Sequence, residues 1–365
     1  MSYSFELNNA RNDAMFASGK INATSPVVEV FSYLTQGKDL SKFGAKADMA
    51  VKYIKELAEK AETGDIRSMS ELNEIRKFVI QPRLLEEIKL LSVFGSYQAL
   101  GWNETAYLVY PKYENLRADI QAEGLDVSTP FYRTSKKPLA PVTISAGWKA
   151  NYREIALGNF YNEGELQEEV RKTIRNKAAM YVLREVFTAI ENATGVKYFY
   201  ENSTLAKASV DALLLKIRKY GKPNVIAPYA VLAQFLPWIG YAGTIGNNTI
   251  TGVSQKLLDE IADTGIIGTY NGSVLTEIPA GINYNEIDTT AQDYKTLLPE
   301  GLGIVVPAGT NPSAIQTFTI GGMTTMTGNN VTTGDIMTRF DLSVAAGVAR
   351  TDTIGIIHDS SLDDL

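Results

Sequence analysis

The stretch ELQEEVRKTIRNKAAMYVLREVFTAIEN, residues 165–192, contains neither proline nor glycine. Its apolar residues recur three or four positions apart, the spacing that places side chains on one face of an α-helix. They are Leu166, Val170, Ile174, Ala178, Tyr181, Val182, Val186, Phe187 and Ile190. At about 1.5 Å per residue the helix would be roughly 40 Å long, whereas a compact chain of this size has a radius of gyration of about 21 Å. We therefore expect one helix that crosses the whole body.

Both ends of this helix are marked. Glu165, Glu168 and Glu169 lie where the positive end of the helix dipole favours acidic side chains. Gly195 follows the last apolar residue, where a left-handed C-terminal cap is favoured. A coiled coil is the alternative, but the apolar stripe covers about four heptads without a steady leucine or isoleucine seam. The pattern favours packing across a β-sheet.

The composition is that of a folded protein without cysteine chemistry. The 365 residues are 45% hydrophobic and 21% charged, which is enough for a sizeable core and two subdomains. The net charge of -6 argues against a protein whose whole surface binds nucleic acid, although a local basic strip could do so. Because cysteine is absent, disulfides, thiolate catalysis and cysteine-ligated zinc are excluded.

The N-terminal residues MSYSFELNNARNDAMF lack a basic region followed by an apolar core. Nowhere do eighteen apolar residues run together. We expect a soluble protein that is made and kept in the cytosol and has no membrane partner.

Little in the sequence points to catalysis. General acid–base chemistry near neutral pH relies on histidine, and the one histidine, His358, is expected at a surface or edge position on a closing strand. Motifs of a nucleophilic serine, a Walker loop, a zinc protease and an EF-hand are absent. We expect no catalytic residue, no metal-binding residue and no cofactor. A cytosolic carboxylate-based hydrolase stays open, because such sites leave no local signature.

Residues 1–45 show no sustained period of either kind, and Phe16 and Phe31 are among their scattered aromatic residues. We expect an arm that becomes ordered only where another surface receives those aromatics, with simple disorder as the alternative. The following region is helical in pattern at 45–62 and at 71–91, and Pro82 is expected to interrupt the second helix.

A long projecting hairpin is predicted next. Strand-like segments at 106–110 and 141–152 flank a polar stretch that contains several prolines. A two-stranded ribbon is marginally stable in water, so this hairpin needs a partner surface. Arg133, Lys136 and Lys137 near its middle and Trp148 on its returning strand give the mixture of basic and aromatic residues favoured at interfaces. A solvated basic loop is the alternative.

The remaining chain alternates helix and strand patterns. We expect helices at 205–220 and 229–239, strands at 224–227 and 304–307, a hairpin at 264–278, an exposed loop at 307–335, and closing strands that include 354–357. The hairpin is the strongest of these predictions, because its centre is an Asn271-Gly272 turn.

This serial order resembles that of the major capsid proteins of tailed bacteriophages, which have the HK97-like fold. Gly268, Tyr270 and Gly272 are similar to the G-x-Y-x-G turn of that family's axial (A) domain, and RFDLSVAAGVARTDTIGIIHD is similar to its closing strands. The resemblance implies an α+β fold. Its parts would be an N-terminal arm at 1–45, the helical part of a peripheral (P) domain at 46–103, an E-loop hairpin at 104–158, a spine helix at 159–200, an inserted α/β A domain at 201–337 and closing P-domain strands at 338–365.

The resemblance also implies a function. Many copies would assemble into hexamers and pentamers that close an icosahedral head shell around double-stranded DNA, and the protein would not be an enzyme. A separate scaffolding protein, a portal and decoration proteins would be partners, with assembly in the host bacterial cytoplasm and a final location in the virion. An encapsulin-type compartment, which shares the fold but encloses a cargo enzyme, is the alternative.

Two groups of site residues are expected. Candidate inter-subunit contacts are Phe16, Phe31, Arg133, Lys136, Lys137 and Trp148. Candidate DNA-facing residues on the long helix are Arg171, Lys172, Arg175 and Lys177, which could meet phosphates without reading sequence. The alternative for the second group is pairing with Glu165, Glu168 and Glu169 as helix neighbours.

Overall fold

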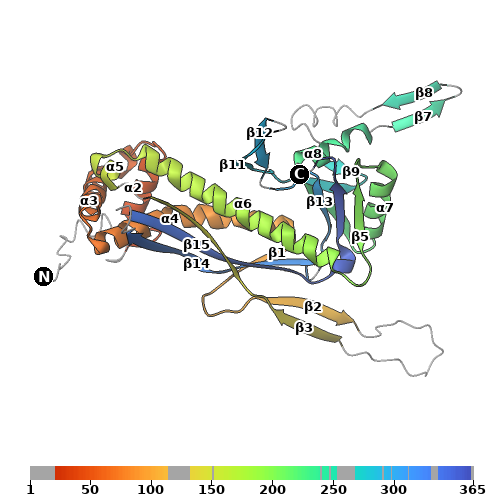
Figure 1. The fold of residues 1–365 in the computed structure, drawn as a ribbon, viewed down its shortest axis with the longest axis horizontal. Helices are drawn as coiled ribbons and strands as arrows, with labels where there is room; N and C mark the ends of the chain where they lie inside the picture. The colour runs from red at the N-terminus through yellow and green to blue at the C-terminus, as the bar shows by residue number, and fades with distance from the viewer. Residues whose placement is uncertain are drawn as a thin grey trace.

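Two β-sheets, a helical lobe and three projecting two-stranded ribbons make up the computed structural model (Figure 1). It describes residues 21–113, 132–149, 152–238, 241–245, 248–252, 268–289, 292–296, 298–310, 312–329 and 336–362. One long helix, α6 (Tyr161–Glu191), lies across the first sheet, as its periodicity predicted (Figure 1).

The first sheet, which we call the spine sheet, joins four distant parts of the chain. Its order is β1 (Ser96–Leu100), β14 (Ile315–Asn329), β15 (Ile336–Val348) and β4 (Val142–Lys149). β1 runs parallel to β14, and the other neighbours are antiparallel.

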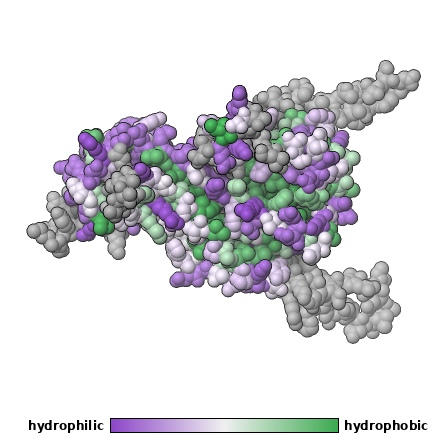
Figure 2. All heavy atoms as spheres, in the orientation of Figure 1, coloured by the Kyte–Doolittle hydropathy of each residue, from purple (hydrophilic) through white to green (hydrophobic). Residues whose placement is uncertain are grey.

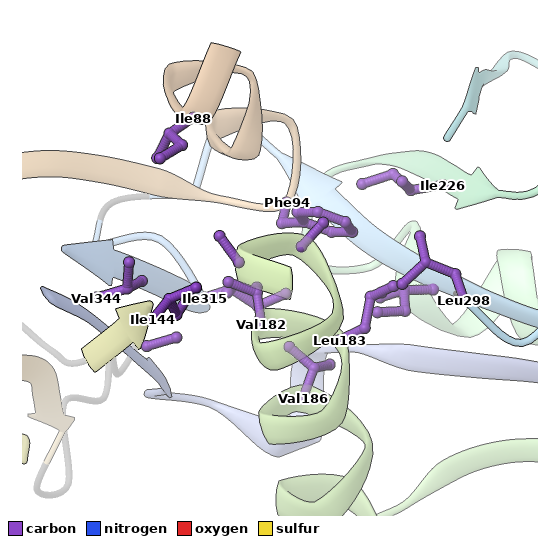
Figure 3. Packing of buried hydrophobic residues seen from close by; sticks show 14 of the residues in the cluster. Ile88, Phe94, Ile144, Val182, Leu183, Val186, Ile226, Leu298, Ile315 and Val344 are labelled. Carbon is purple, nitrogen blue, oxygen red and sulfur yellow. The ribbon is translucent and has the colours of Figure 1, made fainter. Parts of the chain in front are cut away.

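The apolar stripe of α6 is buried against this sheet. Val170, Ile174, Val182, Val186 and Ile190 form one cluster with Ile144 of β4 and Phe340, Leu342 and Val344 of β15. Figure 3 shows Val182, Leu183 and Val186 among Phe94, Ile144 and Ile315. Each fully buried side chain of this size stabilises the fold by about 1.5–3 kcal/mol. The main partner of α6 is thus a sheet, and the coiled-coil alternative is wrong.

The helical lobe has a core of its own. It comprises α2 (Pro26–Thr35), η1 (Ser41–Phe43), α3 (Ala45–Glu62), part of α4 (Ile66–Lys89) and α5 (Tyr152–Leu157), and η2 (Leu90–Val93) follows α4. The expected interruption at Pro82 is absent, because α4 continues through it. Ile80, Leu84 and Ile88 are buried on either side of that proline, and such packing stabilises a helix more than propensity does.

The expectation of an irregular arm was wrong for residues 26–43. Phe31 is fully buried within its own chain, and its ring lies 6.2 Å from that of Phe160 in an edge contact. The helix α2 starts at Pro26, whose fixed φ suits a first turn, but it is too short for its period to stand out in the sequence. Gly164 allows α6 to pass close to the end of α2, because a Cβ there would lie 2.1 Å from the Thr35 carbonyl oxygen. Phe16 lies outside the described residues.

The second sheet has the order β5 (Tyr198–Asn202), β16 (Gly355–Asp359), β13 (Leu302–Ala308), β6 (Lys222–Ala227), β10 (Ser273–Glu277) and β9 (Thr269–Tyr270). α7 (Lys207–Ile217) and α8 (Tyr229–Ala233) pack on one of its faces, with η3 (Leu236–Trp238) after α8 and η4 (Thr351–Thr353) before β16. The β9–β10 turn is confirmed. Asn271 and Gly272 have φ values of 46° and 74°, the positive values that such a turn requires.

The three ribbons stand outside both sheets. They are β2 (Tyr107–Tyr113) with β3 (Tyr132–Pro138), β7 (Tyr241–Ile245) with β8 (Asn248–Gly252), and β11 (Ile282–Asp288) with β12 (Asp293–Thr296). In the described residues each strand of a ribbon is hydrogen-bonded to the other strand of that ribbon and to no third strand.

Three strands differ from the sequence-based expectation. The expected return strand of the hairpin, β4, pairs with β15 in the spine sheet, and β3 is the true partner of β2. The expected loop at 307–335 contains the long strand β14, at the centre of the spine sheet. β16, expected among the closing P-domain strands together with β15, lies not beside β15 in the spine sheet but inside the second sheet, between β5 and β13. A residue pattern marks a strand without naming its partner, which is why β4 and β16 were assigned to the wrong neighbours, whereas β14 is rich in the threonine and glycine that suggest a loop.

A buried ion pair joins α4 to α6. Arg76 and Glu163 are 0% and 5% exposed, and their Nε–Oε1 distance is 2.6 Å. A second nitrogen of Arg76 donates to Glu163 Oε2 at 2.7 Å, a third donates to Asn73 Oδ1 at 2.8 Å, and Gln167 donates to Glu163 at 3.1 Å. The pair is therefore bidentate and its remaining hydrogen-bonding capacity is largely used, which is the condition for a tolerated buried charge pair.

We predict that Arg76→Met lowers the free energy of unfolding of the unassembled chain by about 3–5 kcal/mol, because Glu163 would stay buried without its cation. Urea unfolding followed by circular dichroism measures this change. The double variant Arg76→Met/Glu163→Leu removes both charges and should recover most of the loss. A single-variant loss below about 1 kcal/mol, typical of an exposed pair, would contradict the role assigned to Arg76.

Candidate assembly surfaces

The hairpin β2–β3 is attached to the spine sheet only near its root (Figure 1). Ala106 and Leu108 are buried there, and Ala106 shares a small cluster with Phe318, Ile320 and Ala345. Gln316 of β14 clamps the root from the sheet, because its side chain accepts from the Val109 amide at 3.0 Å and donates to the Val109 carbonyl at 2.6 Å. This glutamine was not identified from the sequence, where nothing distinguishes it from a surface residue.

The basic residues expected on the hairpin lie on β3. Lys136 and Lys137 are exposed and stand opposite Val109 and Leu108 in the ladder. Arg133 stands opposite Lys112, and its side chain lies outside the described residues. The hairpin therefore presents basic residues, but it has no apolar layer of its own in the described residues, which is the situation in which a ribbon needs another surface.

Two other expected contact residues belong to the interior of the chain. Trp148 lies on β4 in the spine sheet, not on the hairpin, and its ring is 5.0 Å from that of Phe340. The Arg76 guanidinium lies 5.5 Å from the Trp148 ring. Phe31 has no exposed side chain, so it is not available to a neighbouring copy.

The four candidate DNA-facing residues of α6 fall into two groups. Arg171 forms ion pairs with Glu87 of α4 and Glu168 of its own helix, and Arg175 lies 3.7 Å from Glu87. Lys172 and Lys177 are exposed, and among the described residues no carboxylate lies within ion-pair distance of either. Of these pairs, Arg171–Glu168 alone joins helix neighbours, because Glu87 belongs to α4. The exposed lysines remain available to another ligand.

His358 does not sit on a sheet edge. It lies on the interior strand β16, its side chain is 16% exposed, and its Nδ1 is 3.2 Å from Glu201 Oε1. Within the described residues no group of histidine or acidic side chains has the arrangement of a metal site. None of the helices in the described ranges is both long and apolar enough to span a membrane.

The ribbon β11–β12 carries exposed apolar residues that the sequence analysis did not single out. Ile282, Ile287 and Tyr294 are 51%, 62% and 44% exposed. On the face drawn in Figure 2, hydrophobic residues gather over the part that holds the second sheet, and the helical lobe is mostly hydrophilic.

Residues 6–358 of the chain match the family described as SPbeta prophage-derived putative capsid protein YonB. No curated protein sequence matches the chain. Its structure is similar to the capsid of the cyanophage P-SCSP1u, at 8% identity and a TM-score of 0.43 over 73% of this chain and 86% of that one. It is similar to the procapsid of satellite phage P4 including the size determination (Sid) protein, at 10% sequence identity and a TM-score of 0.46 over 77% of this chain and 89% of that one. It is also similar to the holo-SrpI encapsulin complex from Synechococcus elongatus PCC 7942, at 11% sequence identity and a TM-score of 0.44 over 76% of this chain and 88% of that one.

We predict that Gln316→Leu frees the hairpin without unfolding the body. Two lost hydrogen bonds at about 1 kcal/mol each should raise the rate of proteolytic cleavage within residues 107–138 about tenfold or more. Limited proteolysis with mass spectrometry measures this rate. Gln98→Leu, an exposed glutamine on the neighbouring strand β1, is the matched control. Equal cleavage of the two variants would mean that Gln316 does not hold the hairpin.

Proposed function

The chain belongs to the YonB family of prophage-derived capsid proteins, and from that premise we propose that it is the major capsid protein of a tailed bacteriophage. Its copies form hexamers and pentamers that close an icosahedral head shell around double-stranded DNA. Shells assemble in the host bacterial cytoplasm, and the protein ends in the virion. Its role is structural, with binding to identical copies as its function.

One observation carries this proposal beyond the family match. Three two-stranded ribbons project from the two sheets, and a ribbon of two strands is marginally stable in water. The hairpin β2–β3 is fixed at Val109, and the exposed Lys136 and Lys137 stand opposite Val109 and Leu108 at its root. Identical neighbours supply the missing cover. Each copy should then bury more than about 2,000 Å² of its surface in total, the range of obligate assemblies.

We also propose a portal, a scaffolding protein, decoration proteins and DNA as partners. These partners are inferred from the proposed shell function, not from particular residues of the chain. A shell that fills with DNA needs a portal and, in this proposal, a separate scaffolding protein, and decoration proteins would bind its outer face. DNA inside the shell would be bound through its phosphates without sequence preference. Of the four candidate residues on α6, Lys172 and Lys177 are best placed for this, because both are exposed and neither has a carboxylate within ion-pair distance in the described residues.

We predict that replacing residues 114–131 with Asn-Gly abolishes shell formation. Tyr113 and Tyr132 stand opposite each other in the ladder, so a two-residue turn can join them and keep β2 and β3 intact. The variant should be a folded, helical chain by circular dichroism and should form no shells in negative-stain electron microscopy, where the wild-type chain does. Normal shells from this variant would refute the role given to the hairpin. Wild-type shells that hold a cargo enzyme and no DNA would identify an encapsulin-type compartment.

A further prediction concerns DNA. Lys172→Gln/Lys177→Gln should lower the slope of log binding constant against log salt by about 0.9 for each phosphate contact that is lost. Fluorescence anisotropy with mixed-sequence double-stranded DNA measures the slope. Lys46→Gln/Lys52→Gln, which removes two exposed lysines of α3, is the control with the same change in charge. Equal slopes in the two variants would show that the α6 lysines do not contact phosphate.

A further inference from the structure

The outer face of α7 is exposed and has an apolar residue at its centre. Val210, Leu213, Leu214 and Ile217 are buried against the second sheet. On the opposite side of the helix Leu215 is 66% exposed, and Ala208 and Ala212 are exposed with it. A single exposed leucine is common on a protein surface, so it is the charge around Leu215 that distinguishes this face.

Positive charge surrounds this apolar centre. Residues 207–222 hold one acidic residue and five basic ones, Lys207, Lys216, Arg218, Lys219 and Lys222, in a chain whose net charge is -6. The acidic residue, Asp211, accepts hydrogen bonds from the Tyr270 hydroxyl at 2.8 Å and the Asn271 amide at 2.9 Å. Among the described residues no carboxylate lies within ion-pair distance of Lys216, Lys219 or Lys222. We call this set, with Leu215, the α7 surface.

The ribbon β11–β12 has the opposite charge and a similar apolar centre. Residues 277–300 hold five acidic residues, Glu277, Glu286, Asp288, Asp293 and Glu300, and one basic residue, Lys295. Ile282, Ile287 and Tyr294 are exposed on the ribbon, and Ile287 stands directly opposite Tyr294 in the ladder. No basic side chain in the described ranges lies within ion-pair distance of Glu286 or Asp293.

The two surfaces lie on opposite sides of the same sheet. α7 packs on the face that buries Val225, Val305 and Ile357. The residues that flank the ribbon, Ile278, Ala280 and Leu298, pack with Ile226, Ile304 and Ile356 on the other face. Figure 1 shows α7 and the β11–β12 ribbon on either side of the second sheet. They cannot meet within one chain.

We propose that the α7 surface of one copy binds the β11–β12 ribbon of a second copy, in a head-to-tail contact that repeats around a ring. Contacts between two different surfaces of identical chains close into rings when the rotation allows it. Leu215 and the exposed Ile282, Ile287 and Tyr294 form the apolar centre. Lys216 and Lys219 face Glu286 and Asp293 at the rim, where complementary charge sets orientation and suppresses wrong pairings. The inference rests on the proposed shell function and assigns the contact within each capsomer.

The test reverses the charge on each surface separately. Lys216→Glu/Lys219→Glu makes both surfaces acidic, and Glu286→Lys/Asp293→Lys makes both basic. Each variant alone should need at least about a tenfold higher protein concentration to assemble than the wild-type chain, since like charges then meet at every contact. An equal mixture should assemble, because each contact between unlike chains again joins opposite charges. Sedimentation measures assembly, and mass spectrometry should find the two chains in equal amounts in the particles.

Assembly of the mixture also shows that the variants are folded, because two misfolded chains would not assemble when they are mixed. Failure of each variant alone can then be assigned to charge repulsion. Alternation of two chains requires an even number of members, so the mixture should form even-membered rings and no five-membered ones. Lys46→Glu/Lys52→Glu, with the same change in charge on the exposed surface of α3, should assemble as the wild-type chain does. Variants that assemble normally, a mixture that stays unassembled, or equal failure of the α3 control would each overturn the contact and leave the shell function standing. A wild-type chain that forms no assembly would overturn both.

Discussion

The apolar stripe of α6 can be buried only when four strands from distant parts of the chain are already side by side. β4 precedes the helix, β1 lies before the hairpin, and β14 and β15 come after most of the second sheet has been built. The helix and the spine sheet bury their apolar residues against each other, in the cluster that forms the largest core of the described residues. Neither element could bury those residues alone. The buried ion pair between Arg76 and Glu163 links α4 to α6. The ribbons that leave this body form no hydrophobic cluster of their own among the residues that the structure describes.

Local signals in the sequence predicted local structure well. The period of residues 165–192 identified α6, and Asn271-Gly272 identified the β9–β10 turn, because in both cases neighbouring residues determine the conformation. Pairing between distant strands was not predicted. The threonines and glycines of β14 suggest an exposed loop, yet Thr317 and Thr319 are buried in the middle of the spine sheet. The apolar residues of α2 cover too few turns to show a period, so the sequence does not indicate that Phe31 belongs to a core.

The candidate surfaces show the same division. Residue type indicated that α6 carries cations, but only the structure separates Arg171, which is held by Glu87 and Glu168, from the exposed Lys172. Nothing in the sequence distinguished Gln316, because its role depends on Val109, which lies far away along the chain. The opposite charges of α7 and the β11–β12 ribbon can be read from the sequence. Their position on opposite sides of one sheet is known only from the structure.

The central claim is that one copy is rigid along α6 and the spine sheet and incomplete at its ribbons, which identical copies cover. Hydrogen–deuterium exchange of the unassembled and the assembled protein tests this most directly, because amides in uncovered ribbons open readily and amides in a packed core do not. We predict that residues 107–113, 132–138 and 282–288 exchange rapidly in the single chain and become protected on assembly, while the amides of α6 are protected in both states. Ribbons that are equally protected before and after assembly would contradict the account.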